Sequence, residues 1–177
     1  MGLIIVCGPR TGSTNLMLSL ASSYSLPYIF EPDIITDFDY SKYKNKIVKY
    51  VLLGELDSDY YKRLIDIIKQ FDTVILLDRK NKEEQSESFY SLRNYGTFYK
   101  KWGHQYIDKT SEQYKDILRD VKIKSEVLVK LSEELNLKIN YYEDVFYNKI
   151  LNDANIKLDL KYLNNNYKLR QDTINII

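Results

Sequence analysis

Short runs of apolar residues alternate along the chain with longer stretches in which apolar residues recur every three or four positions. The apolar runs predict buried strands, since strands covered on both faces of a parallel sheet carry few polar residues. These runs are Leu3–Cys7, Ile47–Leu53, Thr73–Leu77 and Leu137–Tyr141. The longer stretches predict amphipathic helices. They are Ser13–Tyr24, Tyr60–Gln70, Lys82 to about Tyr99, Ser111 to about Leu135 (one long helix or two) and Asp144–Leu151.

Strands that alternate with helices predict an α/β fold with three layers, α/β/α, around a central parallel sheet. Ligands of such folds bind at the carboxyl ends of the strands. The length of 177 residues predicts one domain over residues 1–177. Residues 27 to about 46 are predicted to form a polar segment between the first helix and the next strand. Residues 152–177 are predicted to form a polar tail with scattered apolar residues.

The first predicted strand runs directly into a loop that has the residue types of an anion site. Gly8-Pro9-Arg10-Thr11-Gly12 is followed at once by Ser13-Thr14-Asn15 and a helical pattern. Backbone N–H groups at a helix N-terminus point at an anion, and the helix dipole adds to the attraction. Gly12 permits close approach of the backbone, and Arg10 offers a planar fork of donors. We therefore expect the loop to bind a nucleotide phosphate.

The loop differs from the Walker A pattern, which has four residues between its glycines and a Lys before the Ser or Thr. Here three residues separate Gly8 from Gly12, and Ser13 stands in the place of the Lys. The missing Lys argues against an ATPase or a nucleotide kinase. The chain also lacks the G-x-G-x-x-G pattern of dinucleotide-binding folds.

A second polar segment follows the strand predicted at Thr73–Leu77. It begins with Asp78-Arg79-Lys80-Asn81 and continues into a helical pattern. Asn81, with Glu84 three residues later, has the arrangement of a helix N-cap. Gln85 and Ser88 are three residues apart and so share one face of that helix.

Pro9-Arg10-Thr11-Gly12-Ser13-Thr14 resembles the first nucleotide-binding loop of the sulfotransferases that use 3′-phosphoadenosine 5′-phosphosulfate (PAPS). The pattern Arg79-x-Asn81-Lys82-x-x-Gln85-x-x-Ser88 looks like the second motif of the bacterial trehalose-type members. The resemblance implies a fold related to the P-loop nucleotide kinases. It also implies that the first loop holds the 5′-phosphosulfate and that a cation and Ser88 hold the 3′-phosphate. The cation is Arg79 or Lys80, and we prefer Arg79 because its fork suits a phosphate.

The cofactor-binding residues implied in this way are Arg10, Thr11, Gly12, Ser13, Thr14, Asn15, Arg79, Ser88 and Arg170. Arg170 belongs to a basic segment, Lys168–Asp172, that resembles the part of relatives that closes over the cofactor. Residues 152–177 would then form a cofactor-closing segment. The Tyr-Glu-Asp sequence at Tyr142–Asp144 also recurs in the family, where its role is mainly structural.

Sulfuryl transfer needs a group to stabilise the departing phosphate and a base to take the proton of the acceptor hydroxyl. Arg10 is the candidate for the first role. Glu31 is the candidate base, because related enzymes carry a glutamate in a Phe/Glu/Pro-rich segment after the first helix, as in Phe30-Glu31-Pro32. The alternative base is His104, the only histidine in the chain.

Composition narrows the choice of partners. The 26 Lys and Arg residues against 25 Asp and Glu residues give a net charge of +1, so we expect neither nucleic acid nor membrane as a partner. The single cysteine, Cys7, excludes an internal disulfide, and no zinc-site spacing occurs. No signal peptide or long apolar stretch is seen, so we expect a cytoplasmic protein.

Together these features predict a PAPS-dependent sulfotransferase that needs no metal. It would move a sulfuryl group to the hydroxyl of a small-molecule or glycan acceptor and leave adenosine 3′,5′-bisphosphate. The alternatives are a P-loop nucleotide kinase or other phosphotransferase, and a catalytically degenerate nucleotide-binding protein.

Overall fold

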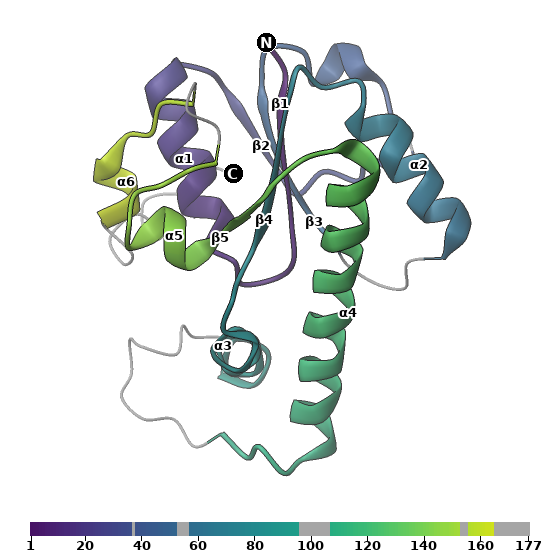
Figure 1. The fold of residues 1–177 in the computed structure, drawn as a ribbon, viewed down its shortest axis with the longest axis vertical. Coiled ribbons are helices and arrows are strands. Elements are labelled where there is room, and N and C mark those ends of the chain that lie inside the picture. The colour runs from purple at the N-terminus through teal and green to yellow at the C-terminus, as the bar shows by residue number, and fades with distance from the viewer. Residues whose placement is uncertain (37, 53–56, 96–106, 153–155, 165–177) are drawn as a thin grey trace.

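The strand Leu3–Cys7 (β1) lies at the centre of the fold, between two strands that follow it in the chain (Figure 1). The computed structural model describes residues 1–177 except 37, 53–56, 96–106, 153–155 and 165–177. Its sheet has five strands in the order β2-β3-β1-β4-β5, and every neighbouring pair is parallel. The other strands are β2 (Tyr28–Phe30), β3 (Ile47–Val51), β4 (Thr73–Asp78) and β5 (Ile139–Tyr141). The predicted α/β class with a central parallel sheet is thereby confirmed.

Helices flank this sheet on both faces (Figure 1). The helices are α1 (Ser13–Tyr24), α2 (Ser58–Ile68), α3 (Lys82–Tyr95), α4 (Glu112–Leu135), α5 (Tyr142–Phe146) and α6 (Leu160–Asn164), with a short 3₁₀ helix at Tyr40–Lys42. One apolar core joins the sheet to α2 and α4, and a second joins it to α1, α5 and α6. Helix α3 lies beyond the carboxyl end of β4 and packs on α4 through Tyr90, Tyr114 and Val121.

The alternation of side chains along β1 explains its uninterrupted apolar sequence. Ile4 and Val6 belong to the core on the α2 and α4 face, whereas Leu3, Ile5 and Cys7 belong to the opposite core. Successive side chains of a strand point to opposite faces, so a strand buried on both sides needs apolar residues at every position.

The ends of α1 and α4 carry left-handed residues and a side-chain cap. Gly12 is left-handed (φ 78°) at the start of α1, and Ser25 (φ 51°) and Asn136 (φ 50°) are left-handed at the ends of α1 and α4. The side chain of Ser111 accepts a hydrogen bond from Tyr114 N at the start of α4. Such caps satisfy backbone groups that have no partner within the helix.

The differences from the predicted elements are small. Of the two alternatives predicted for Ser111 to about Leu135, the structure has the single long helix, Glu112–Leu135. The short helix after β5 spans Tyr142–Phe146 rather than Asp144–Leu151. Three of the described elements were not predicted: β2, the 3₁₀ helix Tyr40–Lys42 and α6. Strand β2 (Tyr28-Ile29-Phe30) is apolar, but at three residues it is too short to be recognised as a strand from its pattern.

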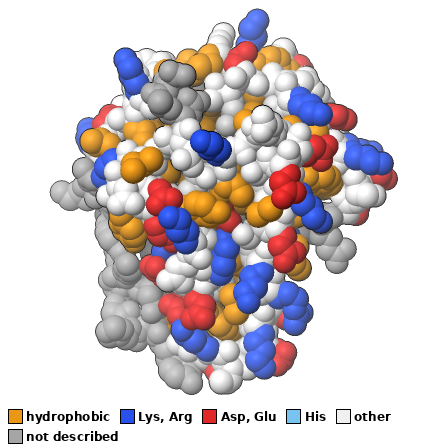
Figure 2. Space-filling model, in the orientation of Figure 1, with side chains coloured by type: hydrophobic (Ala, Val, Ile, Leu, Met, Phe, Trp, Pro, Cys, Tyr) orange, Lys and Arg blue, Asp and Glu red, His pale blue; other side chains and the backbone are white. Residues whose placement is uncertain are grey.

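Charges of both signs are interspersed over the face of the molecule that Figure 2 shows, with apolar side chains between them. Among the described residues, none of the helices combines the length and the apolar character needed to cross a lipid bilayer.

Candidate functional site

The loop between β1 and α1 makes a tight turn at the carboxyl edge of the sheet. Thr11 is fully buried, and its Oγ1 donates to Gly8 O over 3.1 Å. Arg10 (φ 61°) and Gly12 (φ 78°) are both left-handed. Asn15 N and Leu16 N donate to Gly12 O and begin α1, whose first N–H groups have no acceptor within the helix. The turn thus leads from β1 directly into α1.

Aromatic side chains of α5 cover the loop at Gly12. A Cβ at this position would lie 2.7 Å from Cδ2 of Tyr142 and 2.9 Å from Cε2 of Phe146. The two rings are stacked on each other with centroids 4.6 Å apart. Position 12 therefore requires glycine for two reasons, the backbone conformation and the absence of space for a side chain.

Helix α3 contacts the same loop from another side. Arg10 Nε donates to Ser88 Oγ at 2.9 Å, and Gln85 Nε2 donates to Pro9 O at 2.6 Å. The two segments predicted to bind the cofactor, which are 78 residues apart at Arg10 and Ser88, thus meet at one place in the fold.

Lys49 is a charged residue of this site that was not predicted from the sequence. It lies on β3, is 4% exposed, and its Nζ donates to Thr14 Oγ1 at 3.0 Å and to Glu31 Oε1 at 2.5 Å. Its ammonium group also lies 3.7 Å from the centroid of the Phe30 ring. A buried charge needs such compensation to be stable. The available signal was one lysine inside an otherwise apolar strand.

Glu31 follows β2 and reaches the loop through Lys49. Its backbone is left-handed (φ 48°), and its N–H donates to Lys49 O at 3.0 Å. The side chain of Glu31 is 38% exposed, while that of Lys49 is 5% exposed. The carboxylate is therefore held at one end by a buried cation and remains accessible to a molecule from solution.

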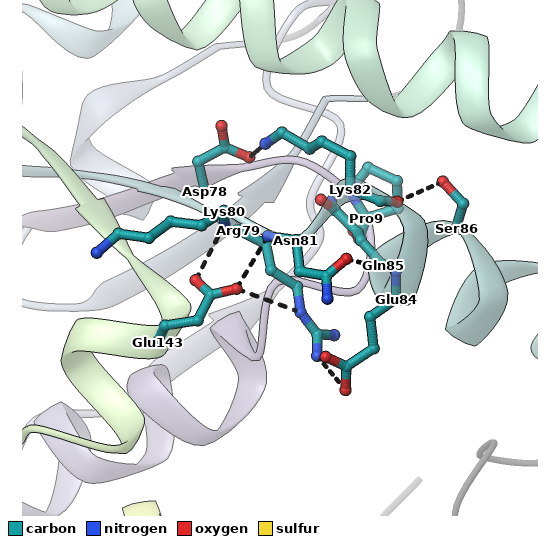
Figure 3. A network of polar contacts seen from close by, with 10 residues as sticks. All are labelled: Pro9, Asp78, Arg79, Lys80, Asn81, Lys82, Glu84, Gln85, Ser86 and Glu143. Atoms are coloured by element: carbon teal, nitrogen blue, oxygen red, sulfur yellow. Dashed lines mark hydrogen bonds and ion pairs between the residues drawn. The ribbon is translucent and has the colours of Figure 1, made fainter.

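Arg79 lies at the end of β4 and faces two carboxylates (Figure 3). One of its terminal nitrogens is 2.7 Å from Glu84 Oε1, and its Nε is 3.9 Å from Glu143 Oε1. The guanidinium also stacks 4.5 Å above the ring of Tyr142, whose edge contacts Gly12. Tyr142 thus connects Arg79 with the first loop.

Lys80, the alternative to Arg79, extends in a different direction. Its side chain is 53% exposed and its Nζ is 2.7 Å from Asp144 Oδ1. The side chain of Arg79, by contrast, is 8% exposed. Of the two cations, only Arg79 contacts the aromatic side chain that covers the loop.

Glu143 fixes the start of α3. Its carboxylate accepts hydrogen bonds from the backbone N–H of Lys80 at 2.9 Å and of Asn81 at 3.1 Å. Asn81 in turn accepts from Glu84 N at 3.0 Å, as the predicted N-cap requires. A carboxylate at a helix N-terminus is favoured by the helix dipole. These contacts give the Tyr-Glu-Asp segment a structural role.

Burial changes the titration of two groups next to the loop. Desolvation raises the pKa of Tyr142 to about 12, so this ring, which stacks with Arg79, remains neutral even above pH 10. Burial likewise raises the pKa of the Cys7 thiol, which donates to Tyr50 O. Cys7 is thereby kept in the unreactive thiol form.

The remaining predicted residues are placed as follows. Ser13 (5% exposed) and Asn15 (8% exposed) are buried at the start of α1, next to Thr14. Arg170 and His104 lie outside the described residues. In the part of the chain that the structure describes, no three His, Cys, Asp or Glu side chains gather closely enough to hold a metal ion.

Three basic side chains therefore surround the loop and its neighbouring helices: Arg10 within it, Lys49 from β3 and Arg79 from β4. The carboxylate of Glu31 lies at the margin of the same site. A comparison of the chain with models of known protein families finds no match, and a search of curated proteins finds none either.

Proposed function

We propose that this protein is a PAPS-dependent sulfotransferase that moves a sulfuryl group to an acceptor hydroxyl by in-line displacement. The observation that carries the proposal is the hydrogen bond from Arg10 to Ser88, because these residues belong to the two segments that resemble the cofactor motifs of that family. A loop that leaves the central strand of a parallel sheet and opens a helix also supports a fold related to the P-loop nucleotide kinases.

Most of the residues at the site fit this cofactor. Arg10, Lys49 and the first N–H groups of α1 would hold the 5′-phosphosulfate, and Arg79 with Ser88 would hold the 3′-phosphate. Within the described residues, Arg79 Nε is buried and makes no hydrogen bond, so it retains a donor for an anion. Glu84 is 29% exposed at its side chain, and it would turn outward where a phosphate takes its place on Arg79.

Glu31 is the proposed base. When bound, PAPS supplies an activated sulfuryl group, and adenosine 3′,5′-bisphosphate remains after the transfer. Glu31 would take the proton of the acceptor hydroxyl, and Lys49 holds its carboxylate next to the loop. A positioned base contributes about 10²–10⁴ in rate. Arg10 and Lys49 would stabilise the charge that develops on the departing phosphate.

A second candidate function is phosphoryl transfer from ATP with Mg²⁺. One observation favours it: Lys49 Nζ lies 3.0 Å from Thr14 Oγ1, so β3 brings to the loop the lysine that the loop sequence lacks. A lysine close to a phosphate loop is a recurring part of phosphotransferase sites.

Calorimetric titration with adenosine 3′,5′-bisphosphate, 5′-AMP and ATP·Mg²⁺ separates these functions. We expect the 3′-phosphorylated nucleotide to bind most tightly, and Arg79→Ala to weaken it by about tenfold or more because a charge-assisted bond is lost. Lys80→Ala is the matched control, since the Lys80 side chain is directed to Asp144, and it should bind as the wild type does.

Equal or tighter binding of ATP·Mg²⁺ would instead support the phosphotransferase. Tight binding of adenosine 3′,5′-bisphosphate with no turnover over a broad panel of acceptor hydroxyls would support a degenerate nucleotide-binding protein.

A further inference from the structure

Gln85 is a buried amide of α3 that reaches the first loop. Its side chain is 1% exposed, and its Nε2 donates to Pro9 O at 2.6 Å (Figure 3). The same nitrogen lies 3.4 Å from the place that a Cβ on Gly8 would occupy, so the amide packs directly on the loop backbone. None of the roles assigned above uses this contact.

The hydrogen bond acts on the peptide that joins Pro9 to Arg10. A trans peptide is planar, and its C=O and N–H point in opposite directions. The bond to Pro9 O therefore also fixes the direction of the Arg10 N–H. Arg10 is left-handed (φ 61°), a conformation that is unfavourable for a residue with a Cβ and that neighbouring groups must hold.

One turn further along α3, Ser88 holds the side chain of the same arginine. Residues at i and i+3 lie on one face of a helix, so a single face of α3 fixes both the backbone and the guanidinium of Arg10. We propose that Gln85 is a positioning residue that holds the Pro9–Arg10 peptide in the conformation that binds the anion. The part of this proposal that concerns the anion rests on the proposed function, and the part that concerns the loop does not.

The amide is needed as a hydrogen-bond donor. Pro9 O is an acceptor, so its partner must present an N–H or an O–H. Within the described residues, Gln85 Oε1 is buried and makes no hydrogen bond, so donation to Pro9 is the contact that this amide makes. A glutamate of nearly the same shape cannot donate when ionised, but it donates through its O–H when protonated.

This difference between ionised and protonated glutamate allows a test whose expected result a loss of packing alone would not produce. In ligand-free protein, Gln85→Glu should increase the hydrogen exchange of the Asn15 and Leu16 amides, which donate to Gly12 O, by about tenfold at about pH 8, relative to wild type at the same pH. The affinity for adenosine 3′,5′-bisphosphate should fall by a similar factor. Both effects should shrink toward about pH 5, because burial raises the pKa of the introduced carboxyl and protonation restores a donor.

Two further variants complete the experiment. Gln85→Met, which keeps the length but never donates, should show faster exchange and weaker binding at every pH. Gln113→Glu makes the same chemical change on an exposed part of α4 and should match the wild type throughout. If Gln85→Glu does not fold at the higher pH, it is compared with Gln85→Met at about pH 5, where the protonated carboxyl can donate and the Met side chain cannot. Exchange in β1 and β4 is the internal reference.

The proposal is wrong if exchange at the Asn15 and Leu16 amides in both Gln85 variants equals that of wild type. It is also wrong if Gln85→Glu and Gln85→Met respond alike at all pH values, since that result describes lost packing only. If wild type binds no adenosine 3′,5′-bisphosphate while the exchange follows the expected pH pattern, the proposed function fails and the role of Gln85 in the loop stands.

Discussion

The lysine on β3 is the residue on which the geometry of the candidate site most depends. Parallel pairing sets Lys49 opposite Phe30 on β2, and its ammonium group links Thr14 at the start of α1 with Glu31 after β2. Glu31 and the loop were predicted from the sequence, but this link between them was not. A lone lysine in an apolar run does not reveal whether its ammonium reaches solvent or a buried partner.

Replacing Lys49 should mainly affect anion binding. Lys49→Met keeps an apolar stem of similar length and removes the charge, and Glu31 loses its partner but is exposed enough to be solvated. We expect the affinity for adenosine 3′,5′-bisphosphate to fall by about tenfold or more, as is usual when a charge-assisted bond is lost. Titration calorimetry measures this loss.

Lys69→Met, at the exposed end of α2, is the control for the general effect of removing one positive charge. An equal loss of affinity in the two variants would mean that Lys49 acts on the nucleotide only through the net charge of the protein.

Among the elements, those with a strong pattern and a clear boundary were predicted best. The bounds of β1 and α1 match the expectation because Gly12 separates an apolar run from a helical pattern. Strand β2 was missed because it has three residues and pairs only with β3. The contact of α3 with the loop was expected only from the family resemblance, since helical spacing identifies a shared face but not what that face meets.

The packing of α5 on the loop leads to a prediction about Gly12. Gly12→Ala forces a Cβ into a left-handed position and against the rings of Tyr142 and Phe146. We expect it to lower the free energy of unfolding by about 2–4 kcal/mol, the sum of backbone strain and overpacking. Urea denaturation followed by circular dichroism measures the change.

Gly8→Ala is the matched control within the same loop. Its nearest neighbour would be Gln85 Nε2 at 3.4 Å, an ordinary contact, so the expected loss is below about 1 kcal/mol. Equal losses at the two glycines would contradict the account of Gly12.

At the scale of the whole molecule, the sequence predicted that both motifs lie at one edge of a parallel sheet, but not the order of the strands. That order places β4 next to β1, and this adjacency brings α3 and Ser88 to Arg10. Strand order depends on how the crossover helices pack, which local periodicity does not encode.

Contacts at the amino ends of the strands, across the sheet from the candidate site, make the stability of the folded protein depend on pH. Asp72 accepts from Gly2 N at 2.6 Å and from the Tyr40 hydroxyl at 3.3 Å. The hydrogen bond from Gly2 is the main reason that the pKa of Asp72 lies below its ordinary value of 3.8. Because this pKa is lower in the folded state, the ionised carboxylate stabilises the fold at pH values above the ordinary pKa. The stabilisation is lost as the pH falls through the pKa of the folded state.

The variant Asp72→Asn keeps an acceptor oxygen but cannot ionise. We expect it to melt at a lower temperature than wild type at about pH 6, with the difference shrinking as the pH falls below about 4. Differential scanning calorimetry at several pH values provides the comparison. A difference in melting temperature that stays constant over this range would contradict the role given to the Asp72 carboxylate.

The central place of β1 also bears on how the protein is made. Leu3 pairs with Ile47 on one side and with Thr73 on the other, so β1 leaves the ribosome before either of its partner strands. Its apolar side chains must stay unaggregated until β4 has been synthesised, a period in which a nascent chain is exposed to misassembly. The rings that cover Gly12 come later still, with Tyr142 and Phe146. The covered conformation of the first loop can therefore form only after the chain has been synthesised as far as α5.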